Sequence, residues 1–151
     1  MTENVEDFLH SLLLFVAAAT SIEYAGTPRG LWRNKAVATD AAATYTVAQI
    51  YPGPPLVLAP INRISVQWRT TGKDSPAMLQ AQRIFDALRA ADGTPMRMRA
   101  ITGKTTAGSA DGVWRLVSVE HNQRPGFLGR DDKGIADYVF NSTLGFFKEP
   151  I

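Results

Sequence analysis

The sequence predicts a single α+β domain in which helices pack on one side of a mostly antiparallel sheet. Two segments carry apolar residues at helical spacing, whereas most of the others alternate apolar and polar residues as strands do. The links between the expected strands are short or hairpin-like, which favours antiparallel pairing. A chain of 151 residues can bury about two-thirds of its unfolded surface, so one domain over residues 1–151 is expected.

A first helix is expected over residues 3–19. Acidic side chains fill its first turn, where the helix dipole favours negative charge. The following stretch, residues 21–43, contains glycine and proline and predicts a loop with a short extended piece near residues 31–37. The apolar residues at helical spacing are Val5, Phe8, Leu9, Leu12, Val16 and Ala19.

The second helix is the best-defined element of the sequence. Ser75 can cap it, Pro76 suits the first helical position, and Gly93 offers a left-handed stop. Its apolar stripe is expected to pack on the sheet face that carries Ile64 and Trp68. This stripe consists of Ala77, Met78, Ala81, Ile84, Phe85, Leu88 and Ala91.

Five alternating stretches predict strands. In residues 63–69, Ile64, Val66 and Trp68 face one way and polar residues face the other. A loop rich in glycine, serine and threonine, residues 103–112, is expected to form the mobile tip of a hairpin, and the polar stretch 122–134 is expected to be rich in turns. The other expected strands cover residues 44–51, 96–102, 113–120 and 136–146.

The composition excludes several kinds of site. The chain has no cysteine, so it has no disulfide, thiol nucleophile or thiolate metal site. Its formal charge of +2 is too balanced to predict a grip on nucleic acid from net charge alone. The longest apolar run, residues 12–19, is too short to cross a bilayer and follows acidic residues, so we expect a protein made in the cytoplasm with no membrane partner.

The histidines give little support for catalysis or metal binding. Neither His10 nor His121 has a second ligand-type residue three or four positions after it on an expected helix, so neither a metal nor another cofactor is expected. An enzyme centred on His121 with Asp131 or Asp132 is a minor alternative. Basic residues flank the two aspartates, which favours a turn with internal ion pairs over a cation site.

Basic residues near the middle of the chain leave two interpretations open. Arg97 and Arg99 share one face of an expected strand, and Lys104 lies in the loop that follows. The preferred interpretation is a solvated strand face. The alternative is an electropositive surface that faces DNA or an acidic partner, as in a small nucleic-acid-binding module.

An apolar pair lies in an otherwise polar segment near the end of the chain. Phe127 and Leu128 have no apolar neighbours in the turn-rich stretch around them. Such a pair on a projecting segment predicts a contact with another protein chain. Packing back onto the chain's own core is the alternative.

Several of these features carry a resemblance to one family. The Tyr51–Pro55 turn, the Ile64–Arg69 strand and the Ala77–Leu88 helix resemble the middle of tail terminator-like and minor capsid (neck) proteins of long-tailed bacteriophages. Arg124–Asp131, followed by Tyr138–Asn141, is similar to the family's pre-terminal loop and last strand, where a proline, an apolar pair and Gly-Arg-Asp recur. The resemblance covers roughly residues 44–146.

The resemblance implies a structural virion protein that forms a hexameric ring at the head-proximal end of a phage tail. Its partners would be copies of itself, the tail tube protein and a head-side connector or stopper, with double-stranded DNA passing transiently. No catalytic residue or cofactor is implied, and another neck protein, such as a head-completion or stopper protein, is the alternative. The expected interface residues are Arg124, Phe127, Leu128, Arg130 and Asp131, and the possible lumen or DNA-facing residues are Arg97, Arg99 and Lys104.

Overall fold

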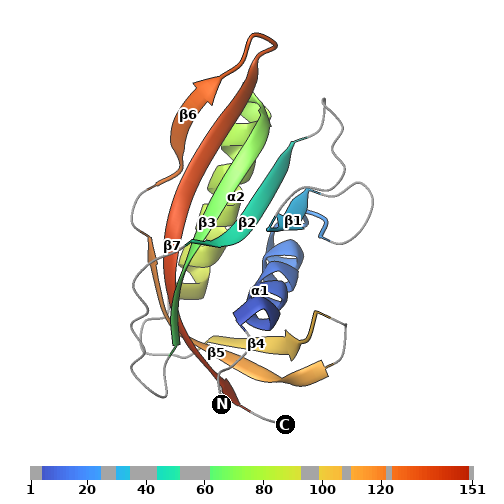
Figure 1. Cartoon of the computed structure of the whole chain (residues 1–151), viewed down its shortest axis with the longest axis vertical. Coiled ribbons are helices and arrows are strands. Elements are labelled where there is room, and N and C mark those ends of the chain that lie inside the picture. The colour runs from blue at the N-terminus through green and yellow to red at the C-terminus, as the bar shows by residue number, and fades with distance from the viewer. Residues whose placement is uncertain are drawn as a thin grey trace.

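Two long antiparallel strands, β3 and β7, form the centre of the sheet (Figure 1). The computed structural model describes residues 5–24, 30–34, 44–51, 62–92, 99–106, 110–121 and 124–149. The elements are α1 (Val5–Thr20), β1 (Leu31–Arg33), β2 (Tyr45–Tyr51), β3 (Asn62–Lys73), α2 (Asp74–Asp92), β4 (Arg99–Lys104), β5 (Ala110–His121), β6 (Gly126–Arg130) and β7 (Ile135–Glu149).

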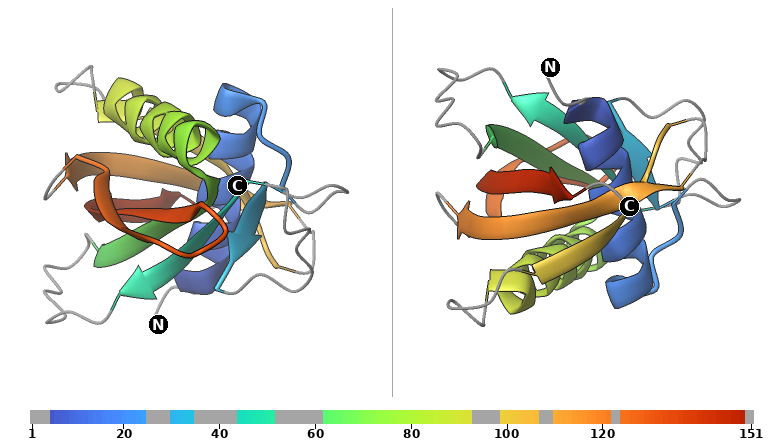
Figure 2. Two further views of the ribbon diagram at one scale, coloured as in Figure 1. Left: turned by 90° about the horizontal axis from the view of Figure 1, so that it is seen from above. Right: turned by 90° about the horizontal axis from the view of Figure 1, so that it is seen from below.

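The described strands form one sheet in the order β1-β2-β3-β7-β5-β4. Every pairing is antiparallel except that of β1 with β2. Two strands share the edge of β7 that faces away from β3: β6 pairs with the first half of β7 and β5 with its second half. The sheet curls strongly, so that both end strands, β1 and β4, contact α1 (Figure 2). The prediction of an α+β fold with a mostly antiparallel sheet is therefore confirmed.

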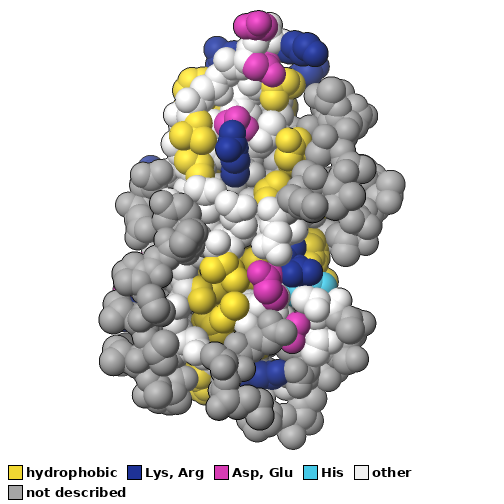
Figure 3. Space-filling view, viewed as in Figure 1, with side chains coloured by type: hydrophobic (Ala, Val, Ile, Leu, Met, Phe, Trp, Pro, Cys, Tyr) yellow, Lys and Arg dark blue, Asp and Glu magenta, His cyan; other side chains and the backbone are white. Residues whose placement is uncertain are grey.

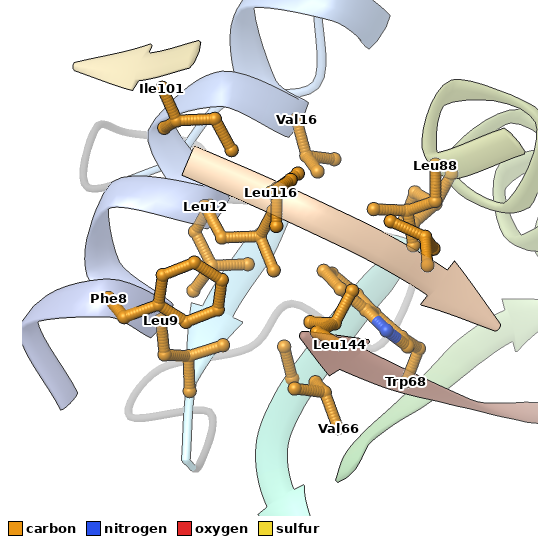
Figure 4. Packing of buried hydrophobic residues seen from close by; sticks show 14 of the residues in the cluster. Phe8, Leu9, Leu12, Val16, Val66, Trp68, Leu88, Ile101, Leu116 and Leu144 are labelled. Atoms are coloured by element: carbon orange, nitrogen blue, oxygen red, sulfur yellow. The ribbon is translucent and has the colours of Figure 1, made fainter. Parts of the chain in front are cut away.

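Both helices pack on the same face of β7. On α1, the ring of Phe8 stacks on that of Phe146, with 3.7 Å between centroids. On α2, the ring of Phe85 meets Phe140 edge-on at 5.5 Å. Phe140 and Phe146 have the same parity on the strand and therefore point to the same side. Figure 4 shows the shared core, to which α1, α2 and strands β3, β4, β5 and β7 contribute.

The expected inward faces are largely confirmed. Val66 and Trp68 are buried, and Ile64 packs partly buried against the same core. The α2 stripe is buried at Ala77, Ala81, Ile84, Phe85 and Leu88.

Met78 was wrongly assigned to the core, since 48% of it is exposed. The small side chains of Ala77 and Ala81 meet β7 at Ala136 and Tyr138, and Met78 lies one helical step, about 100°, round from that contact.

Two of the expected loops are wrong in extent. The stretch 103–112 was expected to be a hairpin tip, yet β4 continues to Lys104 and β5 begins at Ala110. The stretch 122–134 was expected to be turns, yet it contains β6. In both cases a neighbouring strand supplies hydrogen bonds that local composition does not reveal. Neither described helix is long and apolar enough to span a membrane.

Candidate functional site

The β6–β7 hairpin at one end of the molecule carries four of the five expected interface residues, namely Phe127, Leu128, Arg130 and Asp131 (Figure 1). Its turn is closed around Asp131, whose Oδ1 accepts hydrogen bonds of 2.9 Å from the backbone amides of Lys133 and Ile135. The Asp131 amide donates to the Ile135 carbonyl at 2.9 Å, and Gly134 takes a φ of 80°, which glycine adopts without strain. Backbone amides, rather than the expected ion pairs, therefore organise this turn.

A β-bulge sets the orientation of the side chains on β6. Phe127 lies opposite Tyr138, but the next paired residue is Gly129, opposite Asp137, so Leu128 is the inserted residue. A bulge of this kind puts two residues of one strand against one of its partner. As a result, Phe127 and Arg130 lie on the same face of the strand, on the side of the sheet where Ala136 and Tyr138 of β7 meet α2.

An ion pair fastens β6 to the first turn of α2. Arg130 pairs with Asp74, and the same carboxylate accepts a hydrogen bond from the Tyr138 hydroxyl. The Arg130 guanidinium also lies over the Phe127 ring, 5.4 Å from its centroid, and that ring lies 5.6 Å from the Tyr138 ring. Asp74 is well placed for this role, since a carboxylate at a helix N-terminus is stabilised by the helix dipole.

The apolar pair stays exposed despite these contacts. Phe127 is 53% exposed and Leu128 is 57% exposed, so neither joins the core. Packing back onto the core is therefore limited to the contact of Phe127 with Tyr138. Figure 3 shows the upper part of the molecule, where β3, β6 and β7 lie, with hydrophobic side chains exposed between acidic and basic ones. The hairpin thus presents an ordered, partly apolar surface.

The other predicted site residues do not gather at this hairpin. Arg124 is exposed just before β6, whereas Lys104 ends β4 near the opposite end of the molecule (Figure 1). Arg97 lies outside the described residues, and so does the side chain of Arg99. His121 does not lie near the two aspartates. The backbone of His121 lies opposite Ser142 on β7, whereas that of Asp131 bonds Ile135, seven residues away along the same strand. At about 3.3 Å per residue, this separation is roughly 23 Å.

Lys104 borders a second surface feature, a groove of about 320 Å³ between α1 and the edge strand β4. The Lys104 amide holds the end of β4 on the helix by donating to Ser11 Oγ at 2.9 Å. The single proton of that hydroxyl has two carbonyl oxygens within reach, that of Asp7 at 2.9 Å and that of Lys104 at 3.1 Å. The Lys104 side chain itself is exposed. The lining residues are Ser11, Leu14, Phe15, Ala18, Ala100, Ile101, Thr102 and Lys104.

No family model and no curated protein matches this sequence. The resemblance to tail terminator-like proteins therefore stays a prediction from the residues quoted for it.

A polar cluster, which sequence reasoning did not find, joins α1 to β1. The Tyr24 hydroxyl lies 2.7 Å from His10 Nδ1, and Arg33 pairs with Glu6 at 2.8 Å. Burial lowers the pKa of His10, the charges of Arg33 and Lys104 lower it further, and Asp7 opposes them. The only sequence signal for this cluster was the spacing of Glu6 and His10, which lie one helical turn apart on α1. Among the described residues, no three acidic or histidine side chains are grouped so that they could hold a metal ion.

Proposed function

We propose that this chain is a structural subunit that works by assembling with copies of itself. In the form that the resemblance favours, six copies make a ring at the head-proximal end of a phage tail, ending the tail tube and joining it to the neck. The observation that carries the proposal is the exposed Phe127–Leu128 pair on a strand that is already ordered.

Phe127 and Leu128 are suited to association because the strand that carries them, β6, is already ordered within the single chain. Binding costs free energy when loops and side chains must be immobilised, by about 0.5–1.5 kcal/mol for each flexible side chain. Here the strand is paired with β7, and Phe127 is held between Arg130 and Tyr138. Burial of Phe127 therefore contributes to affinity with little of that cost. Exposed, ordered apolar groups rimmed by charges are typical of protein interfaces.

The other proposed partners come from the resemblance. They are the tail tube protein on one side of the ring and a head-side connector or stopper on the other, with double-stranded DNA passing transiently through the opening. A nearly balanced formal charge of +2 supports passage, because a strongly basic lumen would hold phosphates and retard the DNA. The proposed location is the tail or neck of the virion.

A matched pair of substitutions tests the proposal. Leu128 and Leu79 are each 57% exposed, but Leu79 lies on α2. We expect Leu128→Ser to weaken self-association in sedimentation velocity and Leu79→Ser to leave it unchanged, with both variants folded as judged by circular dichroism. Equal association of the two variants would show that β6 does not lie in the interface. The proposal would then lose the observation that supports it.

A further inference from the structure

We propose that the groove between α1 and β4 binds an alkyl carboxylate, with the carboxylate at Lys104 and the alkyl chain along the helix. This inference concerns a small molecule and does not depend on the proposed self-assembly. The groove has a volume of about 320 Å³. Ligand sites in proteins typically have volumes of about 300–1,000 Å³, so this groove has the size of a site for one small molecule.

The helical wall of the groove is a single stripe of α1, which packs against β4 (Figure 1). Ser11, Leu14, Phe15 and Ala18 form this wall at the spacing of helical neighbours. Seven residues at 1.5 Å each give it a length of about 10 Å. An extended alkyl chain, with bonds near 1.5 Å and angles near 111°, advances about 1.25 Å per carbon, so about eight carbons match the wall.

The charge of the groove selects an anion. Among the residues described along it, Lys104 is the one with a charged side chain, and the others are apolar or carry a hydroxyl. The Lys104 side chain is exposed and forms no ion pair with any residue that the structure describes. An ammonium beside an apolar surface, without a counter-ion of its own, attracts a molecule that joins an anionic head to an apolar chain.

A second donor lies beside the ammonium. Thr102 and Lys104 are exposed, whereas Ile101 and Gly103, which alternate with them, are buried, so the two exposed side chains share one face of β4. Their Cα atoms are about 6.6 Å apart at the ordinary rise of a strand. A carboxylate between them can accept hydrogen bonds from both the ammonium and the Thr102 hydroxyl. One cation and one hydroxyl match a singly charged head group.

The charged end of the groove is ordered without a ligand. The Lys104 amide donates to Ser11 Oγ at 2.9 Å, and the Thr106 amide donates to Asp7 Oδ1 at 2.9 Å. Both contacts tie the end of β4 and the residues after it to α1. Asp7 is buried and directed at this backbone amide, so its carboxylate does not neutralise the Lys104 ammonium. Little ordering of the backbone is therefore needed on binding, which favours affinity.

Titration of the folded chain with sodium octanoate tests for the site. We expect saturable binding to one site by isothermal titration calorimetry, with amide chemical shifts that change at Ser11, Thr102 and Lys104. From butanoate to octanoate, the affinity should rise about two- to fourfold for each added methylene, because each buries apolar surface along α1. Longer chains should gain little once they extend past Ala18.

Removal of the charge tests the role of the carboxylate. Lys104→Met keeps most of the side-chain length, and we expect it to weaken octanoate binding by at least about fivefold. The affinity for octan-1-ol, which has the chain without the charge, should stay within about twofold of the wild type. Lys133→Met removes an exposed lysine from the β6–β7 turn and should leave the affinity for octanoate unchanged.

Filling of the groove tests the position of the alkyl chain. Ala18 is exposed, so Ala18→Trp should fold, and its ring should occupy the apolar wall. We expect this variant to lose at least about tenfold in affinity for octanoate and for octan-1-ol alike. Ala19→Trp, at the next exposed position of α1 and outside the groove lining, is the matched control. Circular dichroism shows that each variant is folded.

Three results would overturn the inference. The first is a wild type that binds no octanoate in a saturable way. The second is octanoate binding that survives Ala18→Trp, because the ligand would then lie elsewhere. The third is equal octanoate binding by the wild type and Lys104→Met, because the groove would then have no preference for a carboxylate. None of these results bears on self-assembly, which the mass of the protein measures separately.

Discussion

Arg130 and Phe127 lie on the same face of β6, with the guanidinium carbon 5.4 Å from the centre of the ring. Three residues apart on a regular strand, they would point to opposite faces. The bulge at Leu128 removes this mismatch and lets Arg130 reach Asp74 while covering part of Phe127. The insertion of Leu128 thus lets Arg130 fasten the hairpin to α2, and Leu128 itself stays exposed.

The ion pair between Arg130 and Asp74 should contribute little by itself. Both side chains are nearly half exposed, so a double-mutant cycle with Arg130→Ala and Asp74→Ala should give a coupling free energy below about 1 kcal/mol. Asp74→Ala alone should cost more, about 1–2 kcal/mol, because it also removes the acceptor of the buried Tyr138 hydroxyl. Urea unfolding of the four proteins measures both values. A cost for Arg130→Ala equal to that of Asp74→Ala would show that the hydroxyl contact has no separate value.

The core and the hairpin should respond differently to truncation of a phenylalanine. Phe85 is 4% exposed and packs on Phe140, so Phe85→Ala should lower the free energy of unfolding by about 3–5 kcal/mol. Phe127→Ala should cost less than about 1 kcal/mol, because its side chain is half in solvent. A comparable loss for both in urea unfolding would mean that Phe127 belongs to the core.

Two glycines offer a matched test of the backbone. Gly112 has a φ of 91°, and a Cβ there would lie 2.5 Å from the Glu149 carbonyl oxygen, so Gly112→Ala requires movement of β7. We expect it to lower the melting temperature by several degrees, consistent with a loss of about 1–3 kcal/mol. Gly129→Ala should leave the melting temperature nearly unchanged, since nothing lies within 4 Å of its Cβ. Equal melting temperatures for the two variants would contradict this account of Gly112.

His10 should make stability depend on pH. Burial and the nearby charges lower its folded-state pKa below the ordinary value of 6.5, so the unfolded chain takes up a proton first as the pH falls. The wild type should therefore lose stability below about pH 6.5, until the pH passes the folded-state pKa.

His10→Gln is the reference for this effect, because it keeps a polar partner for Tyr24 and cannot titrate. The other histidine, His121, is present in both proteins and cancels. A difference in unfolding free energy that stays constant between pH 7.5 and 5.5 would exclude His10 as the source.

Sequence patterns predicted the elements whose signals are local. The helix over 3–19 is confirmed as α1 to within two residues, and the inward face of β3 follows from alternation alone. The helix predicted to begin at Pro76 is confirmed as α2, although it begins two residues earlier, at Asp74, so Ser75 lies inside the helix and does not precede it as a cap.

Features that depend on residues far apart in the sequence could not be predicted. The strand β6 exists because β7 pairs with it, and its bulge is a property of that register. The link from Arg130 to Asp74 spans two elements with no sequence pattern between them. Phe127 and Leu128 could be singled out because an apolar pair in a polar segment is a local anomaly. Tyr138, which contacts Phe127, and Asp74, which pairs with Arg130, could not.

The most direct test of the central claim is the absolute mass of the purified chain by native mass spectrometry, over a range of concentrations, with and without phage tail tubes. The account predicts a closed assembly, with six times the 16.5 kDa chain mass as the expected value. A single-chain mass at every concentration, with tubes present as well as absent, would contradict the claim that this protein works by self-assembly.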